Sequence, residues 1–245
     1  MTGFFGRVTQ MLSKDNVRFN PSDILLGILM LVIAGLGFMK GYDLILEARV
    51  RNIADQAIKI QSSYYRFIDF YRHIPGDWVA EEASLSISGI ETGGNGNGFL
   101  DLVDGDPWKE SLAVWEHLFK ANLIDVGYMK EATVLGRGKV YAPINAFGAP
   151  MMLFSTSDYF DISSSPPKRL GLMLGRGIPV SVLEKLDKKI DDGYPASGLI
   201  RYVADGSDTF GEFSTSGSAC VDASQTPPVW FVQEDALDCN AIHLY

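Results

Sequence analysis

The sequence predicts an α+β protein in which one long N-terminal helix packs on a small antiparallel sheet. The first observation is an uncharged apolar run of 16 residues, Ile24–Met39, after which no proline interrupts the chain before Pro75. The second is a set of apolar residues at helical spacing in the segment that follows. The third is a series of short strand-like segments in the rest of the chain, separated by turns rich in Gly, Asn and Ser.

The apolar run is long enough for the first half of the helix to cross a bilayer. As an α-helix, Ile24–Met39 would span about 24 Å, and the uncharged flank Phe19–Ser22 extends the segment to about 20 residues. Glycines in this stretch are compatible with a membrane helix, where small residues favour close helix contacts. We therefore expect the lipid bilayer to be the first partner of this chain.

Basic residues gather on the N-terminal side of the apolar run. They are Arg7, Lys14 and Arg18, against Asp15 alone. By the positive-inside rule, the N-terminal tail stays cytoplasmic and the chain after Lys40 is exported. The expected parts are a cytoplasmic leader or tail at residues 1–18, a transmembrane half-helix at 19–41, and an exported head at 42–245.

The second half of the helix is amphipathic. Its apolar residues follow one another in alternating steps of four and three, which places them on one side of a helix. They are Leu46, Val50, Ile53, Ala57, Ile60, Tyr64, Phe67 and Tyr71. This seam predicts a helix packed against the head, although a signal anchor followed by an ordinary core helix produces the same pattern.

Turn and cap residues delimit the next elements. Proline disfavours helix at the residue before it, so the long helix should end at His73–Asp77. Gly89–Asp106 is a loop rich in Gly, Asn and Asp. A helix is expected at Pro107–Ala121, because proline suits a first helical position and Asp106 suits the cap.

Most of the remaining chain is expected to form strands and turns. Strands are predicted at Lys139–Ile144, Met151–Ser155, Leu170–Leu174 and Gly198–Val203. A short helix is predicted at Pro179–Ile190, with Lys188 and Lys189 at its C-terminal end. The last two strands, Val229–Gln233 and Ala241–Tyr245, are expected to pair with each other, after a polar loop at Ala204–Ala219.

Charge and motif content restrict the function. The 245 residues carry a net charge of −9, so the soluble part is not expected to bind nucleic acid or anionic lipid. No GxSxG, HExxH or phosphate-loop motif is present. His73, His117 and His243 lack metal-ligand spacing, and His117 is expected to be a structural residue of an apolar helix. We therefore do not expect an enzyme.

The two cysteines, Cys220 and Cys239, lie near the C-terminus. In an exported domain they are expected to form a disulfide, which closes a loop of about 20 residues and stabilises the fold by about 3 kcal/mol. Two free thiols in a reducing compartment are the alternative.

Several stretches taken in order resemble type IV pilins, pseudopilins and their minor relatives. The stretches are SSYYRFIDFYRHIPGDW at 62–78, GNGNGFLD at 94–101, ESLAVWEHLFKANLID at 110–125 and KLDKKIDDGYPASGLIR at 185–201. The late cysteine pair completes the series, which covers most of residues 19–245.

The resemblance implies a protruding N-terminal helix, an antiparallel sheet and a C-terminal disulfide loop. It also implies storage in the inner membrane with a periplasmic head, followed by extraction into a type IV pilus or a type II secretion pseudopilus. The partners would be other pilin-like subunits, through the N-terminal helix, and an inner-membrane assembly platform. A single-span protein whose head binds a ligand or another component without polymerising is the first alternative, and a membrane-tethered enzyme is the second.

The resemblance assigns roles to three residues at the start of the helix. Family members are cut after a glycine and before a methylated phenylalanine, with a glutamate at the fifth mature position. Phe19 matches that phenylalanine and Asp23 falls fifth, but Arg18 replaces the glycine. Our hypothesis is that the tail stays attached. With the tail attached no amine exists at Phe19, and Asp23 is expected to cap the membrane helix. In the family, the carboxylate at this position pairs with the N-terminal amine of a neighbouring subunit during assembly, which is the alternative role for Asp23.

Calcium is the one cofactor that the sequence suggests. Asn95 and Asn97 lie at the spacing of a calcium loop, but Gly93 stands where an aspartate is needed. A second acidic turn contains Asp187, Asp191 and Asp192, and pseudopilins hold calcium in sheet-side loops. Helix capping and turn formation are the alternative for this turn.

Overall fold

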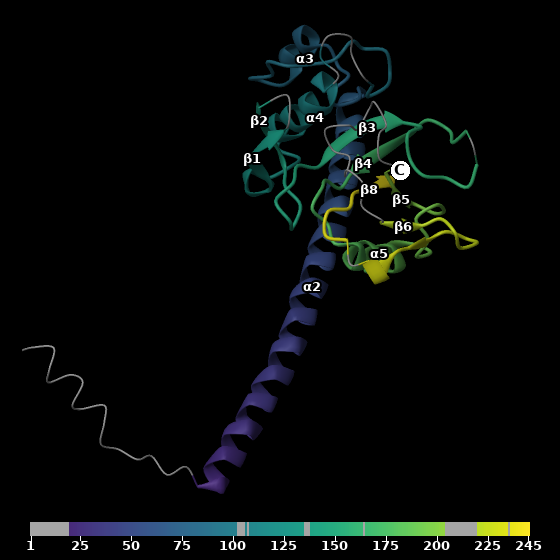
Figure 1. The fold of residues 1–245 in the computed structure, drawn as a ribbon. Helices are drawn as coiled ribbons and strands as arrows, with labels where there is room; N and C mark the ends of the chain where they lie inside the picture. The colour runs from purple at the N-terminus through teal and green to yellow at the C-terminus, as the bar shows by residue number, and fades with distance from the viewer. Residues whose placement is uncertain are drawn as a thin grey trace, which may run out of the picture. The chain divides into compact units, whose positions relative to one another are not determined.

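The computed structural model describes residues 20–101, 106, 108–134, 138–163, 165–203, 220–234 and 236–245. The chain divides into two compact units, Met1–Ile45 and Leu46–Tyr245. The division falls inside helix α2, Pro21–Tyr71, which has 51 residues and is the longest coiled ribbon in Figure 1. One helix therefore supplies residues to both units.

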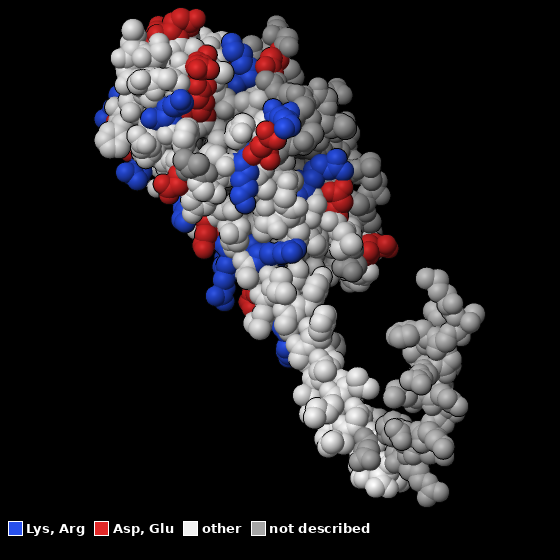
Figure 2. All heavy atoms as spheres, turned by 90° about the vertical axis from the view of Figure 1, so that its left-hand side faces the viewer, with Lys and Arg blue, Asp and Glu red and all other residues white. Residues whose placement is uncertain are grey.

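In the first unit, α2 exposes apolar side chains to solvent. Leu25, Leu31 and Phe38 are 70%, 75% and 85% exposed. Figure 2 shows the lower end of the protruding helix without basic or acidic side chains, whereas both signs are interspersed over the visible face of the second unit. By length and composition, α2 is the one helix among the described residues that could cross a membrane. The expectation of a membrane-length helix near the N-terminus is confirmed.

In the second unit, α2 buries the predicted seam. Every seam residue from Leu46 to Phe67 is buried, and Tyr71 is partly buried. The seam belongs to the same hydrophobic cluster as strand residues that include Leu153 and Ile242. The helix ends at Tyr71, close to the predicted stop, where Arg72 adopts a left-handed conformation with φ of 59°.

The rest of the second unit contains short helices and three antiparallel sheets (Figure 1). The helices are α3 (Ala80–Ser86), α4 (Lys109–Lys120), η1 (Val126–Tyr128), α5 (Val180–Ile190) and η2 (Val232–Glu234). The strands are β1 (Met129–Val134), β2 (Gly138–Pro143), β3 (Met152–Thr156), β4 (Arg169–Met173), β5 (Ile200–Tyr202), β6 (Val221–Asp222), β7 (Val229–Trp230) and β8 (Ala241–Leu244). The predicted α+β class is confirmed.

The main sheet has the strand order β3-β4-β8-β5, and β1-β2 and β6-β7 form two-stranded sheets. All four residues of β8 are buried, so both faces of the main sheet are covered at its centre. Predicted helices and strands that coincide with α4, α5, β2, β3, β4 and β5 differ from them by at most two residues at either end.

The predicted pairing of the last two strands is wrong. β7 pairs with β6, in the register Val221 opposite Trp230, whereas β8 lies between β4 and β5. Both segments have strand-like composition, but composition does not specify a partner. The fully buried β8 lies at the centre of the main sheet, where burial of its apolar residues stabilises it, and the two-residue β7 forms a small ribbon with β6.

The sequence did not predict α3, β1 or β6. α3 has only seven residues, fewer than a hydrophobic period needs to be visible. β1 is the mixed segment MKEATV, and it is a strand because each residue pairs with one of β2, from Met129 opposite Pro143 to Val134 opposite Gly138. The Ala204–Ala219 loop lies outside the described residues.

Candidate functional site

The carboxylate of Asp77 holds the glycine–asparagine loop from one side. Asp77 follows the end of α2 and is only 4% exposed. Its Oδ1 accepts the N–H of Asn97 at 3.0 Å, and its Oδ2 accepts the N–H of Gly98 at 2.8 Å. Its main-chain oxygen accepts the N–H of Gly96 at 2.9 Å. Charge-assisted hydrogen bonds of this kind are about twice as strong as neutral ones, so Asp77 fixes the loop against the head.

The carboxylate of Glu110 holds the same loop from the other side. Glu110 is fully buried in the first turn of α4 and accepts the N–H groups of Asn95 at 3.0 Å and Asp101 at 2.9 Å. Burial raises the pKa of Glu110, and the two N–H donors act against that shift. Sequence reasoning missed both carboxylates. The sequence did contain one indication: Glu110 stands four residues before the apolar Val114, which places this acidic residue on the buried side of the predicted helix.

His117 and Glu116 complete the attachment of this loop to α4. His117 is fully buried; its Nδ1 accepts the N–H of Gly76 at 3.0 Å, and its Nε2–H donates to the carbonyl of Thr92 at 2.8 Å. Burial lowers the pKa of His117, which keeps the imidazole neutral. The carboxylate of Glu116 accepts the N–H groups of Glu91 at 2.7 Å and Thr92 at 3.0 Å. The prediction of a structural His117 is confirmed.

The loop side chains form turns of their own. Asn95 Oδ1 accepts the N–H of Asn97 at 2.9 Å, and Asn97 Oδ1 accepts the N–H of Phe99 at 2.9 Å. These are Asx turns. Since the two amide oxygens already accept backbone donors, the geometry favours the plain turn over the calcium loop. Leu100, at the end of the loop, is buried with 1% exposure.

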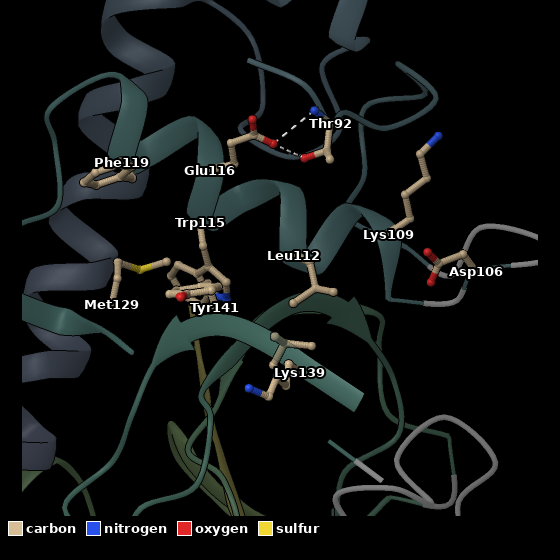
Figure 3. A pocket seen from close by; sticks show the side chains of 11 residues that line it. Thr92, Asp106, Lys109, Leu112, Trp115, Glu116, Phe119, Met129, Lys139 and Tyr141 are labelled. Carbon is tan, nitrogen blue, oxygen red and sulfur yellow. Dashed lines mark hydrogen bonds between the residues drawn. The ribbon is translucent and has the colours of Figure 1, made fainter. Parts of the chain in front are cut away.

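An apolar groove crosses α4 beside the β1-β2 hairpin (Figure 3). It encloses about 690 Å³, within the usual range of ligand pockets. Its apolar lining consists of Leu112, Trp115, Phe119, Met129, Val140 and Tyr141. Polar residues at its margin are Thr92, Asp106, Lys109, Glu116 and Lys139. The oxygens of Glu116 are bonded to the neighbouring loop, so the groove offers an apolar binding surface rather than an acid–base pair.

The three aspartates proposed as calcium ligands do lie together at the end of α5. One oxygen from each of Asp187, Asp191 and Asp192 lies within 4.8 Å of the others. Asp187 is fully buried, and its oxygens accept the indole N–H of Trp230 at 2.7 Å and the N–H of Gly193 at 3.2 Å. Burial raises the pKa of Asp187 to about 7.

The neighbouring carboxylates also serve turn formation. Asp192 accepts the N–H of Tyr194 at 2.9 Å and the hydroxyl of Ser197 at 2.6 Å, and Asp191 accepts the N–H of Leu199. These bonds are what the capping alternative requires. Calcium binding by this cluster remains a prediction.

Cys220 and Cys239 form the expected disulfide. Cys239 lies in a bridge with Ile178, before α5, and the main-chain oxygen of Cys220 accepts the N–H of Phe231, after β7. The disulfide thus joins the β6-β7 ribbon to the segment that enters β8.

The residues at the start of the helix are described only in part. Arg18 and Phe19 lie outside the described residues. Asp23 falls in the first turn of α2, and its side chain also lies outside them. The expectations about cleavage, methylation and assembly at these three positions stay predictions.

Comparison of the chain with protein-family models, with curated proteins and with solved structures finds no match.

Proposed function

We propose that this protein is a structural subunit of a type IV pilus or pseudopilus-type filament, anchored by α2 in the inner membrane before assembly. Its head is periplasmic, its tail is cytoplasmic, and its partners are other pilin-like subunits and an inner-membrane assembly platform. The observation that carries the proposal is the dual character of α2. Its residues Ile24–Met39 form an uncharged run with exposed apolar side chains, and those from Leu46 on bury a seam in the core of an α+β head.

The physical reason for polymerisation is the apolar surface of the first half of α2. Ile28 and Leu36 are 54% and 60% exposed, and α2 carries many more apolar residues of this kind before Leu46. In a bilayer this surface contacts lipid, and outside a bilayer it must be covered by equivalent helices. Storage in the membrane followed by helix–helix packing satisfies both requirements.

Cysteine cross-linking tests the proposal. The two native cysteines are joined to each other, so a single introduced cysteine is the only free thiol. Under assembly conditions, Ile28→Cys and Leu36→Cys should give covalent dimers that copurify with a filament fraction containing the wild-type chain. Leu85→Cys, at a head position that is 88% exposed, is the matched control. Failure of both helix variants to cross-link, with normal expression in the membrane, would contradict the proposal.

A second candidate is a single-span protein whose head binds a partner without polymerising, and the apolar groove across α4 favours it. Leu112→Glu would place a charge in that groove. Loss of a copurifying partner in this variant, with membrane insertion intact and no filaments from the wild type, would favour this candidate over the subunit.

The mature N-terminus tests the processing hypothesis separately. The intact mass of protein purified from native membranes should include residues 1–18 if the tail stays attached. A mature chain that begins at Phe19 would instead assign Asp23 its family role in assembly.

A further inference from the structure

The loop held by Asp77 and Glu110 carries the only two Asn-Gly dipeptides of the sequence, Asn95-Gly96 and Asn97-Gly98. Both asparagines are exposed. Because glycine has no side chain, its backbone nitrogen can approach the amide carbon of a preceding asparagine. The nitrogen loses its proton and bonds to that carbon, and ammonia leaves, which gives a cyclic succinimide. Water then opens the ring to aspartate or isoaspartate.

In the folded head, the attacking nitrogens are engaged elsewhere. The N–H of Gly98 donates to the Asp77 carboxylate at 2.8 Å, and the N–H of Gly96 donates to the Asp77 main-chain oxygen at 2.9 Å. A nearby carboxylate also disfavours loss of the N–H proton, because the nitrogen would become anionic beside a negative charge.

The side-chain amides of the two asparagines, which the nitrogens would attack, are also hydrogen-bonded. Each asparagine oxygen accepts an N–H from two residues further on, at 2.9 Å in both cases. The Asn97 amide nitrogen, which would leave as ammonia, donates to Asp101 at 3.1 Å. Reaction therefore requires the loop to open first.

We infer that Asn95 and Asn97 form a latent deamidation site and that Asp77 keeps it closed while the head is folded. The two positions depend on Asp77 differently. The side chain of Asp77 binds the N–H of Gly98, whereas the main-chain oxygen of Asp77 binds the N–H of Gly96. A substitution of the Asp77 side chain therefore frees the nitrogen that attacks Asn97 and keeps the hydrogen bond of Gly96. The inference does not depend on filament assembly.

The two reactions would have different consequences. An aspartate formed at position 97 would face Asp101, replacing a donor with a second negative charge. An aspartate at position 95 would still accept the N–H of Asn97, so the turn would be kept. Asn97→Asp is therefore expected to open the loop and Asn95→Asp to leave it closed.

The experiment follows deamidation in the full chain, purified in detergent micelles and incubated at neutral pH. Proteolytic peptides that contain the loop are separated, and the Asn, Asp and isoaspartate forms at each position are measured by mass spectrometry. A synthetic peptide of residues 91–101 gives the rate of the unstructured sequence. Asp77→Asn is the test variant. Asp238→Asn is the control, because Asp238 also accepts a glycine N–H, that of Gly177, far from this loop in the sequence.

In the folded wild type, both asparagines should react at least about tenfold more slowly than in the peptide, since each opening must break a hydrogen bond to a charged group or a turn. Asp77→Asn should raise the rate at Asn97 by about tenfold, the loss of one charge-assisted bond. It should change the rate at Asn95 by less than about twofold, and Asp238→Asn should change neither.

Two results would overturn the inference. One is an equal rate in the folded chain and the peptide, and the other is an unchanged Asn97 rate in a folded Asp77→Asn variant. If that variant does not fold, hydrogen exchange of the wild-type Gly98 amide decides instead. Slow exchange supports a closed site, and exchange as fast as in the peptide contradicts it.

Discussion

Three buried titratable side chains give the head opposing responses to pH. Burial lowers the pKa of His117 and lowers that of His243 to about 4, whereas it raises the pKa of Asp187 to about 7. The histidines are neutral in the folded state and charge on unfolding in mild acid, so they destabilise the fold as pH falls. Asp187 binds its proton more tightly in the folded state, so it destabilises the fold as pH rises.

His243 is a buried histidine of β8 whose acid response can be tested by substitution. It lies in β8, is 5% exposed, and its Nδ1 has no hydrogen-bond partner among the residues that the structure describes. The unfolded chain binds a proton that the folded chain does not between pH 6.5 and about 4. We expect a loss on the order of 3 kcal/mol across that window. Urea unfolding as a function of pH should show this loss in the wild type and a flatter profile in His243→Leu; equal slopes would contradict it.

Asp187 should produce the opposite trend at higher pH. Its contribution to stability is complete below pH 3.8 and is lost as pH rises through about 7. Asp187→Asn should therefore lose less unfolding free energy than the wild type between pH 5 and 8, by a few kcal/mol as an order of magnitude. An identical profile in the two proteins would rule out this assignment.

The same variant tests the predicted calcium site. A divalent cation would offset the repulsion among the three aspartates. If it binds, added calcium should raise the wild-type Tm at pH 8 and should raise that of Asp187→Asn less. A Tm that does not respond to calcium would leave capping and turn formation as the role of the cluster.

At the scale of one element, α2 allows a matched comparison of buried and exposed positions. Ile53 is fully buried in the seam, and Ile58 is 57% exposed on the same helix. Ile53→Ala should cost about 2–5 kcal/mol of unfolding free energy, the usual range for a cavity in a core. Ile58→Ala should change it by less than about 0.5 kcal/mol. Similar losses in the two variants would mean that the seam does not pack as described.

Periodicity explains how much of the fold could be predicted from sequence. The seam of α2 was predictable because apolar residues in steps of four and three over several turns lie on one side of an α-helix. The hydrogen bonds that hold the glycine–asparagine loop were not predictable, because Asp77 and Glu110 lie 33 residues apart and only the fold brings them to the same loop. The partner of β8 was not predictable for the same reason, since the register between distant strands depends on tertiary packing.

The acidic cluster at the end of α5 was likewise predictable only for residues that are close in the sequence. Asp187, Asp191 and Asp192 could be grouped because they lie within six residues of one another at a helix end. The indole of Trp230, which bonds to Asp187, comes from a strand 43 residues later, so sequence spacing gave no sign of it.

At the scale of the whole molecule, the C-terminus is part of the fold's interior. β8 contributes four buried residues between β4 and β5, and the hydroxyl of Tyr245 donates to the carbonyl of Ala57 in α2 at 3.3 Å. Deletion of residues 241–245 should therefore abolish the folded head. Loss of dispersed amide signals or of resistance to limited proteolysis measures this outcome; a truncated chain that remains protease-resistant would contradict it.

The central place of β8 also has a consequence for the order in which the protein matures. A ribosome delivers β4 and β5 before β8, so the main sheet stays split, with β4 and β5 lacking their common neighbour, until residues 241–244 have been synthesised. Completion of the main sheet therefore follows the synthesis of α2. The unfinished chain exposes the unpaired edges of β4 and β5 during that interval, which favours association with other chains.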